Sequence, residues 1–395
     1  MKRIWGVSSL VVLSACISQP PPVELPQFSE YEAERRAEMI ERATTILDVA
    51  KDEDAWDLGI LSQDAASAGR EDVHKQIHRP HFQPDRLVCE PGEPRPALDQ
   101  IVELADTHSL IIINEHHAEP SHRLFIGDLA ARLREKGFTH YAAEAFRPEI
   151  VNGEGYPRAG EGYYASEPMF ARSIHRLRTL GYELVAYEAR PDQVDYFSDD
   201  VKKQMNDREE AQANNLIDAV LGQNPDAKLI VHVGHGHVAE FPPPVPDAMP
   251  WMAARLKAKT GIDPLTISLT YCRSETGVPV LSTQAVNHDG KQIEKYTDYL
   301  IGLPPKMMQR NRPAYRVELG DRFVEVPAKL RPTDGPILIE ARPPGAALEH
   351  APIERLVLSP GEDIPLLLPP GRWSLVSVDA DGVVIGAAEI EVSAG

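Results

Sequence analysis

The spacing of hydrophobic residues changes twice along this chain of 395 residues. Within a first segment over 29–97, residues 29–88 carry the three- and four-residue spacing of amphipathic helices, which is clearest in "EAERRAEMIERATTILDVA". From 98 to 303, short apolar runs alternate with helix-like segments, a rhythm typical of an α/β sheet with helices on both faces. From 313 to 395, short β-rich runs are separated by proline and glycine, and "DADG" (379–382) predicts a hairpin turn. We expect a helical preface, an α/β domain and a small C-terminal all-β sandwich domain.

Four apolar runs of the middle region predict strands with polar residues at their carboxyl ends. The runs are "SLIIIN", "THYAA", "YELVAY" and "KLIVHV", and helices are predicted between them at 120–136, 165–180 and 199–222. Pro120 suits the first turn of the first helix, and Gly137 can end it. Ligands of open α/β sheets bind outside the carboxyl ends of the strands. The residues at these ends are Glu115 and His117, Glu144, Glu188 and Arg190, and Gly234 to His237.

The N-terminus has the pattern of a secretion signal. Lys2 and Arg3 precede the apolar run "IWGVSSLVVL", and "LSAC" ends on Cys16. This pattern resembles the lipobox of bacterial lipoproteins, which implies a signal peptide over 1–15, a lipid on Cys16 and a Pro-rich tether over 16–28. The apolar run of about ten residues is too short to span a bilayer comfortably. No aspartate follows Cys16, which resembles outer-membrane sorting, so we expect a membrane-anchored lipoprotein facing the periplasm or the cell surface.

The charge and the remaining cysteines limit the partners and the compartment. The formal charge is −19, and removal of Lys2 and Arg3 with the signal peptide leaves −21. This acidity excludes nucleic acid and anionic membrane surfaces as partners, so the lipid anchor would be the only membrane contact. An oxidising compartment permits a disulfide between Cys89 and Cys272, although the sequence does not give their separation. Self-association stays open.

The stretch "NEHHAEPSH" (114–122) gathers a glutamate and three histidines at one strand end. It is not the zinc-protease motif H-E-x-x-H, because His117 and His122 are five residues apart with Pro120 between them. His117 therefore belongs to the strand end and His122 to the first turn of the next helix. Adjacent residues of extended chain point to opposite sides, so we expect His116 to point away while His117 faces the site. The alternative is a polar loop with a capping role.

The stretch "IVHVGHGHVAE" places His235 and His237 beside two glycines, which permit a tight turn. It lacks the Lys and Ser/Thr of a phosphate loop, and the alternative is a Gly-rich turn with surface histidines. With the glutamate of "YAAEAF", Glu144, the two histidine motifs resemble the superfamily of TraB/TIKI-type metallopeptidases, erythromycin-esterase-like hydrolases and ChaN-like haem-binding lipoproteins. The resemblance covers about 98–303. Asn114 stands where the family has glycine, and "AEPSHR" with His122 resembles the lipoprotein branch.

A helix arginine adds to this set. Arg208 lies on a predicted apolar stripe formed by Val201, Met205, Gln212, Leu216 and Val220. A guanidinium on such a stripe needs an anionic partner, either a ligand or a structural carboxylate, and snorkelling is the other alternative. The resemblance implies an arginine near the site. The Gly-rich segment "NGEGYPRAGEGYY" (152–164) is either a lid that brings Tyr156, Tyr163 or Tyr164 to the substrate or a mobile surface loop.

Two functions from different classes fit these residues. In a hydrolase, His117 and His237 would bind a divalent metal (Mn, Co or Zn) or act as polar catalysts, Glu115 or Glu144 would accept a proton from water, and Arg208 would stabilise negative charge. His122, His235 and Tyr163 are secondary candidates, and the substrate is a small molecule or a peptide. The alternative is a lipoprotein that captures haem or metal without catalysis, with a histidine or tyrosine as axial ligand. The C-terminal domain shows no chemistry and would be a packing or docking module.

Overall fold

The computed structural model describes residues 25–49, 55–73, 87–241, 248–287 and 289–394. A seven-stranded sheet runs through the middle of the chain in the order β4-β3-β5-β2-β6-β10-β7. All neighbours in it are parallel except the edge pair β10 and β7. Its strands are β2 (Leu110–Glu115), β3 (His140–Ala143), β4 (Glu183–Ala186), β5 (Leu229–Gly234), β6 (Leu265–Ser268), β7 (Val280–Ser282) and β10 (Tyr299–Gly302). The four strands predicted from the apolar runs are confirmed.

Helices cover both faces of this sheet, as expected. Ile111 and Ile113 of β2 join the core under α4 (Ala97–Leu104), α5 (Pro120–Leu133) and α6 (Pro168–Thr179). Leu110 and Ile112 point the other way, into the core under α7 (Val201–Leu216) and α8 (Met252–Thr260). This split follows from the two-residue repeat of a strand, and it explains why β2 is apolar at every position before Asn114.

The remaining strands form smaller sheets. β1 (Val88–Cys89), β8 (Ala285–Val286) and β9 (Gln292–Ile293) make one sheet, and β11 (Met308–Gln309) with β12 (Arg312–Pro313) makes another. In the C-terminal part, β14 (Ile337–Arg342), β15 (Glu354–Leu358), β17 (Gly371–Val378) and β18 (Val384–Val392) form a four-stranded antiparallel sheet. The pair β13 (Arg322–Val324) and β16 (Leu366–Leu368) shares a hydrophobic core with it, so a small sandwich results. The predicted turn after β17 is confirmed, since the backbone N–H of Gly382 donates to the carbonyl of Asp379.

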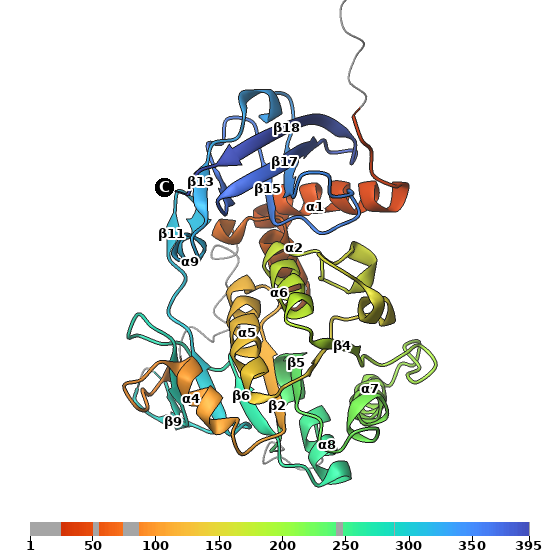
Figure 1. The fold of residues 1–395 in the computed structure, drawn as a ribbon, viewed down its shortest axis with the longest axis vertical. Coiled ribbons are helices and arrows are strands. Elements are labelled where there is room, and N and C mark those ends of the chain that lie inside the picture. The colour runs from red at the N-terminus through yellow and green to blue at the C-terminus, as the bar shows by residue number, and fades with distance from the viewer. Residues whose placement is uncertain (1–24, 50–54, 74–86, 242–247, 288, 395) are drawn as a thin grey trace, which may run out of the picture.

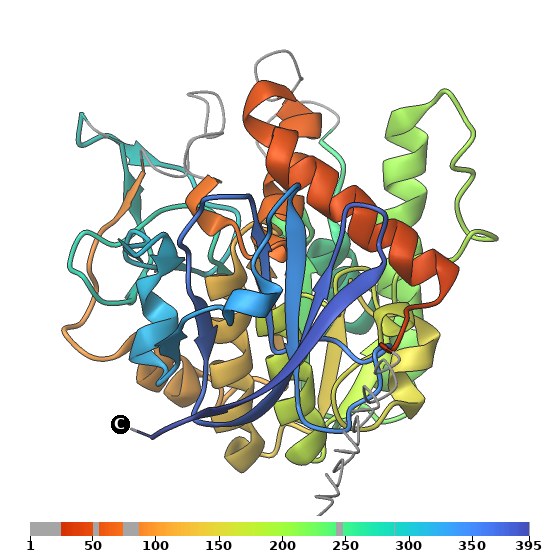
Figure 2. The same ribbon diagram turned by 90° about the horizontal axis from the view of Figure 1, so that it is seen from above.

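The helical preface packs on the C-terminal sheet. It contains α1 (Glu30–Val49) and α2 (Ala55–Ser67), and Ile40 of α1 shares a buried cluster with Leu338 and Val376. Figures 1 and 2 show α1 lying across the C-terminal strands, away from the central sheet. Inside this contact, Arg36 lies 3.0 Å from the fully buried carboxylate of Glu340. A buried charge needs such a partner, so α1 and the C-terminal sheet are tied together by charge as well as by apolar packing.

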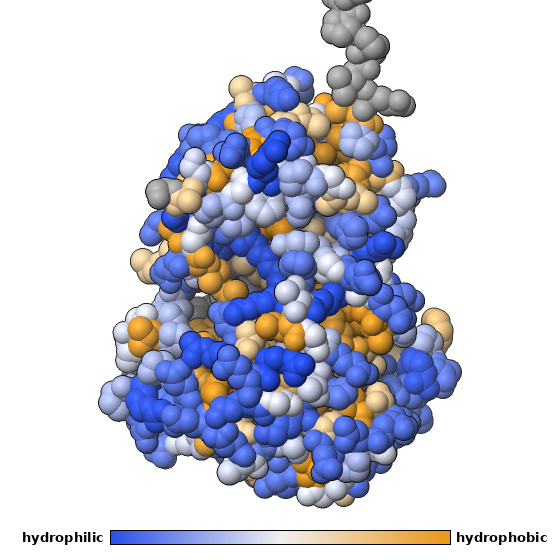
Figure 3. Space-filling view, viewed as in Figure 1, coloured by the Kyte–Doolittle hydropathy of each residue, from blue (hydrophilic) through white to orange (hydrophobic). Residues whose placement is uncertain are grey.

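Covalent and polar contacts join the parts further. Cys89 and Cys272 form the disulfide that the sequence left open, with their Cα atoms 5.2 Å apart. Arg172 of α6 lies 3.0 Å from Asp321, which stands between α9 (Ala314–Glu318) and β13. The face in Figure 3 is mostly hydrophilic with scattered hydrophobic patches, in keeping with the acidic composition. In the part of the chain that the structure describes, no helix is long and apolar enough to span a membrane, and Cys16 lies outside that part.

Candidate functional site

The end of β2 holds a buried carboxylate and the imidazole that it orients. Glu115 is fully buried, and its Oε1 lies 2.9 Å from Nδ1 of His117. Its Oε2 lies 2.9 Å from Nε of Arg123 and 3.2 Å from Nε2 of His232. Burial raises the pKa of Glu115, but Arg123 and His232 outweigh it and hold that pKa well below its usual range. Glu115 is thus a fixed anion, and the Nε2 of His117 is left to face the site.

Glu144 follows β3 and lies at the centre of the cluster. Its Oε2 accepts a hydrogen bond of 2.5 Å from the backbone N–H of Gly234, and its Oε1 lies 2.6 Å from Nη2 of Arg208. Nε2 of His117 and Oε2 of Glu144 both lie within 3.0 Å of the point where a Cβ on Gly234 would stand. A side chain at Gly234 would therefore displace the imidazole. Burial raises the pKa of Glu144, but His237 and Arg208 lower it to about 2.

His237 approaches Glu144 from the other side and is held by a second carboxylate. Its Nδ1 lies 2.6 Å from Oε1 of Glu209, a buried residue of α7, and its Nε2 lies 3.5 Å from Oε1 of Glu144. Burial lowers the pKa of His237, but Glu144 and Glu209 together raise it above its ordinary value. Nε2 also lies 3.1 Å from Nη1 of Arg208, so the neutral imidazole accepts a hydrogen bond from the guanidinium. His117 and His237 therefore flank Glu144, each held through Nδ1 by a glutamate.

Arg208 connects this cluster to the end of β4. Besides Glu144 and His237, it binds Glu188 with Nε at 3.0 Å and Nη2 at 2.5 Å, which is a bidentate pair. Arg208 thus has the anionic partner that the sequence predicted, in the form of the carboxylates of Glu144 and Glu188. The prediction that its side of the helix is buried along its whole length is wrong over the first turns of α7. Val201 and Met205 are 63% and 41% exposed, because this half of the helix projects past the body on which the other half packs (Figure 2).

The turn after β5 is held in an unusual backbone conformation. His235 has φ of +37°, which is rare for a residue other than glycine. The side chain of Asn114 donates to the carbonyl of His235 at 2.6 Å and to the hydroxyl of Thr270 at 3.0 Å. Asn114 thus fixes this turn from the neighbouring strand. His235 stands 4.8 Å from His117, ring centre to ring centre.

The other histidine of the pair, His116, does not join the Glu144 cluster. Its ring centre lies 5.2 Å from that of His235, and both rings line a neighbouring pocket. His122 is buried in the first turn of α5 and accepts a hydrogen bond from the backbone N–H of His116. Burial lowers its pKa to about 4, so it supports the turn as a neutral group. Both positions agree with the predicted division of "NEHHAEPSH" between a strand end and a helix start.

Of the three tyrosines in the Gly-rich segment, Tyr164 reaches the cluster. Tyr156 stacks on His175 at 4.3 Å and packs against the C-terminal core, and Tyr163 is 65% exposed. Tyr164 is the tyrosine that reaches the site, with its ring 5.2 Å from that of His117 and 4.4 Å from the guanidinium of Arg123. The sequence did not single out Arg123 or Glu209. For Arg123 the available signal was a charged residue followed by apolar residues in a helix, whereas Glu209 stands in the charged run 207–210 and offered no such signal.

The donor atoms of the cluster do not fit a divalent metal. The point where Glu144, Glu188 and His237 converge is taken by the guanidinium of Arg208, which already supplies the positive charge there. Glu115 has its oxygens engaged by Arg123, His117 and His232. Within residues 25–394, apart from the segments left undescribed, no group of three or more histidine, cysteine or acidic residues has the arrangement of a metal site.

Comparisons with known proteins give only distant likenesses. No family model matches the chain, and no curated protein matches it. Among solved structures, RRSP, a MARTX toxin effector domain from Vibrio vulnificus, aligns at 16% identity and a TM-score of 0.32 over 51% of this chain and 38% of that one. The type III effector HopBA1 aligns at 16% identity and a TM-score of 0.35, over 57% of this chain and 99% of that one. The C-terminal region of Pasteurella multocida toxin aligns at 10% identity and a TM-score of 0.29, over 86% of this chain and 54% of that one. Likenesses this weak carry no argument about function.

Proposed function

We propose that the protein is a hydrolase that activates water with carboxylate-held imidazoles and without a bound metal. One observation carries the proposal: the pairs Glu115–His117 and Glu209–His237 flank Glu144 at the carboxyl edge of the sheet, with Arg208 as the local cation. A carboxylate on Nδ1 fixes the tautomer of an imidazole and leaves Nε2 to exchange protons. The resemblance to the TraB/TIKI and erythromycin-esterase-like superfamily is consistent with this chemistry and remains part of the proposal.

Each residue of the cluster has one task in the reaction. Nε2 of His117 takes a proton from water while the water oxygen bonds to the carbonyl carbon of an ester or amide. The resulting oxyanion is stabilised by the positive charge of Arg208, which His237 helps to hold in place through its Nε2. When the bond to the leaving group breaks, His117 returns the proton to that group. Glu144, whose pKa is about 2, is too weak a base for the first step and holds Arg208 and the turn at Gly234 in place.

A hydrolysis assay with matched variants tests this assignment. The purified full chain is tested on p-nitrophenyl acetate, a γ-lactone and an aminoacyl p-nitroanilide. We expect His117→Ala to lower kcat/KM by about 100-fold or more, the usual share of general acid–base catalysis. His237→Ala should also lower kcat/KM, because Arg208 loses the imidazole that helps to hold it. His140→Ala is the control, because His140 stands at the amino end of β3, on the opposite edge of the sheet. Equal rates for all four proteins, or no hydrolysis of any substrate class, would refute the assignment.

Metal and haem binding are tested on the same preparation. We expect elemental analysis to find far less than one Mn, Co or Zn per chain and chelators to leave the rate unchanged. The haem-capture alternative predicts a Soret shift on titration with haem and its loss in His235→Ala or Tyr163→Phe. Stoichiometric metal, or a rate that a chelator abolishes, would favour the metal-dependent form of the hydrolase instead.

We also propose that the chain is lipidated on Cys16 and anchored in the outer membrane. The support is the lipobox-like sequence alone, which lies outside the described residues. Labelled palmitate should enter the wild-type protein in bacterial cells and not the Cys16→Ser variant. Equal labelling of the two would contradict the anchor while leaving the hydrolase proposal intact.

A further inference from the structure

A third imidazole, that of His232, lies behind the pair formed by Glu115 and His117. It belongs to β5 and is 2% exposed, and the proposed reaction gives it no task. Its Nε2 lies 3.2 Å from Oε2 of Glu115, and its Nδ1 lies 2.8 Å from the hydroxyl of Tyr141. Because β5 lies between β3 and β2, these three side chains form a polar row across neighbouring strands. The row ends on His117, whose Nδ1 contacts Oε1 of Glu115.

The polar row lies inside the apolar core between the sheet and the helices α5 and α6. Tyr141 shares this core with Ile113 of β2 and Phe170 of α6. The ring of Phe170 stands edge-on to the ring of His232, with 5.6 Å between the ring centres. A buried polar group without a partner is costly in such surroundings. The hydroxyl of Tyr141, the imidazole of His232 and the carboxylate of Glu115 therefore depend on one another for partners.

The contacts show where the protons of the polar row lie. Nε2 of His232 faces a carboxylate oxygen, and a nitrogen lone pair in that place would be repelled, so Nε2 carries a proton. Tyr141 keeps its hydroxyl proton, because burial and the negative charge of Glu115 raise the pKa of the phenol well above its usual range. That hydroxyl donates to Nδ1 of His232. The donors thus point in one direction, from Tyr141 through His232 to Glu115.

His232 fixes the side of Glu115 that faces away from His117. Oε2 of Glu115 has two cationic or N–H partners, Nε of Arg123 at 2.9 Å and Nε2 of His232 at 3.2 Å. Arg123 comes from α5, whereas His232 comes from the strand paired with β2, opposite Ile113. His232 therefore ties the carboxylate to the sheet itself. With Oε2 held from both sides, the carboxylate cannot turn, and Oε1 stays 2.9 Å from Nδ1 of His117.

We propose that His232, held in turn by Tyr141, is a positioning residue for the reaction at His117. It fixes the carboxylate of Glu115, and through it the orientation of His117 and the tautomer that leaves Nε2 free to take a proton. It touches neither the substrate nor the reacting water. The kinetic part of this proposal rests on the proposed hydrolase function, but the tautomers of the two imidazoles do not depend on any reaction.

Three variants separate the contact with Glu115 from the mere volume of the side chain. His232→Leu removes the donor, whereas His232→Gln places an amide N–H close to the position of Nε2. We expect His232→Leu to lower kcat by about 10- to 100-fold, the usual effect of a small displacement of a reacting group. KM should stay within about twofold, since His232 does not bind substrate. His232→Gln should restore kcat to within about threefold of wild type, and Tyr141→Phe should cost about threefold, as for one neutral hydrogen bond.

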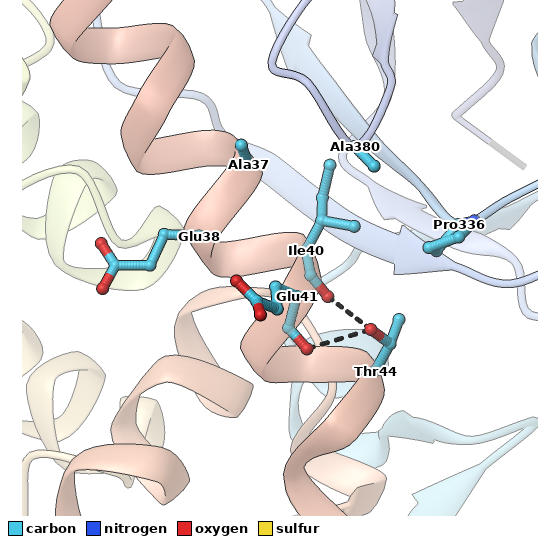
Figure 4. A pocket seen from close by; sticks show the side chains of 7 residues that line it. All are labelled: Ala37, Glu38, Ile40, Glu41, Thr44, Pro336 and Ala380. Atoms are coloured by element: carbon cyan, nitrogen blue, oxygen red, sulfur yellow. Dashed lines mark hydrogen bonds between the residues drawn. The ribbon is translucent and has the colours of Figure 1, made fainter.

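A variant that destabilises the fold far from the polar row is the matched control. Ile40 of α1 is 1% exposed and lines a cavity of about 390 Å³ between α1 and the C-terminal sheet, together with Thr44 and Pro336 (Figure 4). This cavity shares no residue with the site. Ile40→Ala should lower the melting temperature, because it enlarges a cavity in a packed contact, and leave kcat as in wild type.

The tautomers are measured by 15N NMR on the full chain with labelled histidine, at a pH of about 8, above the ordinary pKa of histidine. In wild type we expect the proton on Nε2 in His232 and on Nδ1 in His117. In His232→Leu, His117 should become a mixture of the two tautomers, and His232→Gln should restore the Nδ1 form. Kinetics use p-nitrophenyl acetate or, if it is not hydrolysed, the γ-lactone or the anilide.

The proposal is overturned if His232 carries its proton on Nδ1 in wild type, which is decisive even if His232→Leu does not fold. It is also overturned if His232→Leu leaves kcat and the tautomer of His117 unchanged, or if kcat falls as far in His232→Gln or Ile40→Ala as in His232→Leu. If the tautomers behave as expected and the wild type hydrolyses none of the substrates, the positioning of His117 is supported and the hydrolase function fails.

Discussion

Replacing Arg208 by methionine removes the cation around which the site is built. The change keeps most of the apolar stem but deletes the contacts to Glu144 at 2.6 Å, to Glu188 at 2.5 and 3.0 Å, and to His237 at 3.1 Å. Glu144 is the more buried of the two carboxylates, with a side chain 11% exposed against 28% for Glu188. Losing the ion pair with Glu144 should therefore destabilise the fold more than losing the pair with Glu188.

The magnitude follows from the pKa of Glu144. A fall from 4.5 to about 2 corresponds to about 3 kcal/mol of preference for the charged form, at 1.36 kcal/mol per unit. His237 contributes more of this fall than Arg208, and His117 and the backbone N–H of Gly234 also contribute, so the share of the arginine is less than half, about 1 kcal/mol. The pair with Glu188 is about 30% exposed and adds at most about 1 kcal/mol. We expect Arg208→Met to lower the free energy of unfolding by about 1–2 kcal/mol at pH 7.

The pH dependence separates this cause from a general packing loss. A depressed carboxylate pKa stabilises the folded state above the unfolded pKa, and this stability disappears as the pH falls from about 4.5 to about 2. Near pH 3 most of the contribution of Glu144 is gone from the wild type, so the difference in unfolding free energy between the two proteins should fall to about half of its value at pH 7. Equilibrium urea unfolding followed by circular dichroism measures both values.

The control is Arg176→Met, because Arg176 is 52% exposed and pairs with Asp128 at the surface. It should cost at most about 1 kcal/mol. For Arg208→Met, a loss of less than about 0.5 kcal/mol at pH 7, or a loss that is equally large at pH 3, would show that the ion pair with Glu144 does not stabilise the fold.

Three further changes address contacts that hold the site. Replacing Cys89 and Cys272 by serine should lower the free energy of unfolding by about 4–5 kcal/mol, since the disulfide closes a separation of 183 residues, and denaturation with and without reductant measures it. Glu209→Gln removes the anion on Nδ1 of His237 and should lower the pKa of that imidazole, which NMR titration detects; an unchanged pKa would contradict the contact. Asn114→Ala should cost about 1–3 kcal/mol and speed proteolysis in the turn after β5, and an unaltered digestion pattern would argue against its clamping role.

The local pattern of apolar, proline and glycine residues predicted most helices and strands of the central α/β region. Pro120 and Gly137 mark the beginning of α5 and the end of its last, 3₁₀ turn, where Gly137 has φ of +87°. The apolar runs predicted β2 and β5 because a parallel strand covered on both faces must be apolar throughout. The exposure of Val201 and Met205 was missed, because periodicity shows which face of a helix is apolar but not where its packing partner ends.

The sequence by itself determined that glutamates and histidines stand at strand ends, because the order of residues fixes which side chain follows each strand. It did not determine which of them meet. β5 lies between β3 and β2, and this strand order brings the segments that carry Glu144, His237 and His117 together at one edge of the sheet. The packing of α7 places Glu209 against His237. It also places the guanidinium of Arg208 next to His237, at a position where the sequence allowed a divalent metal ion as one alternative. Long-range contacts of this kind depend on how layers pack, and that information is not contained in any single stretch of residues.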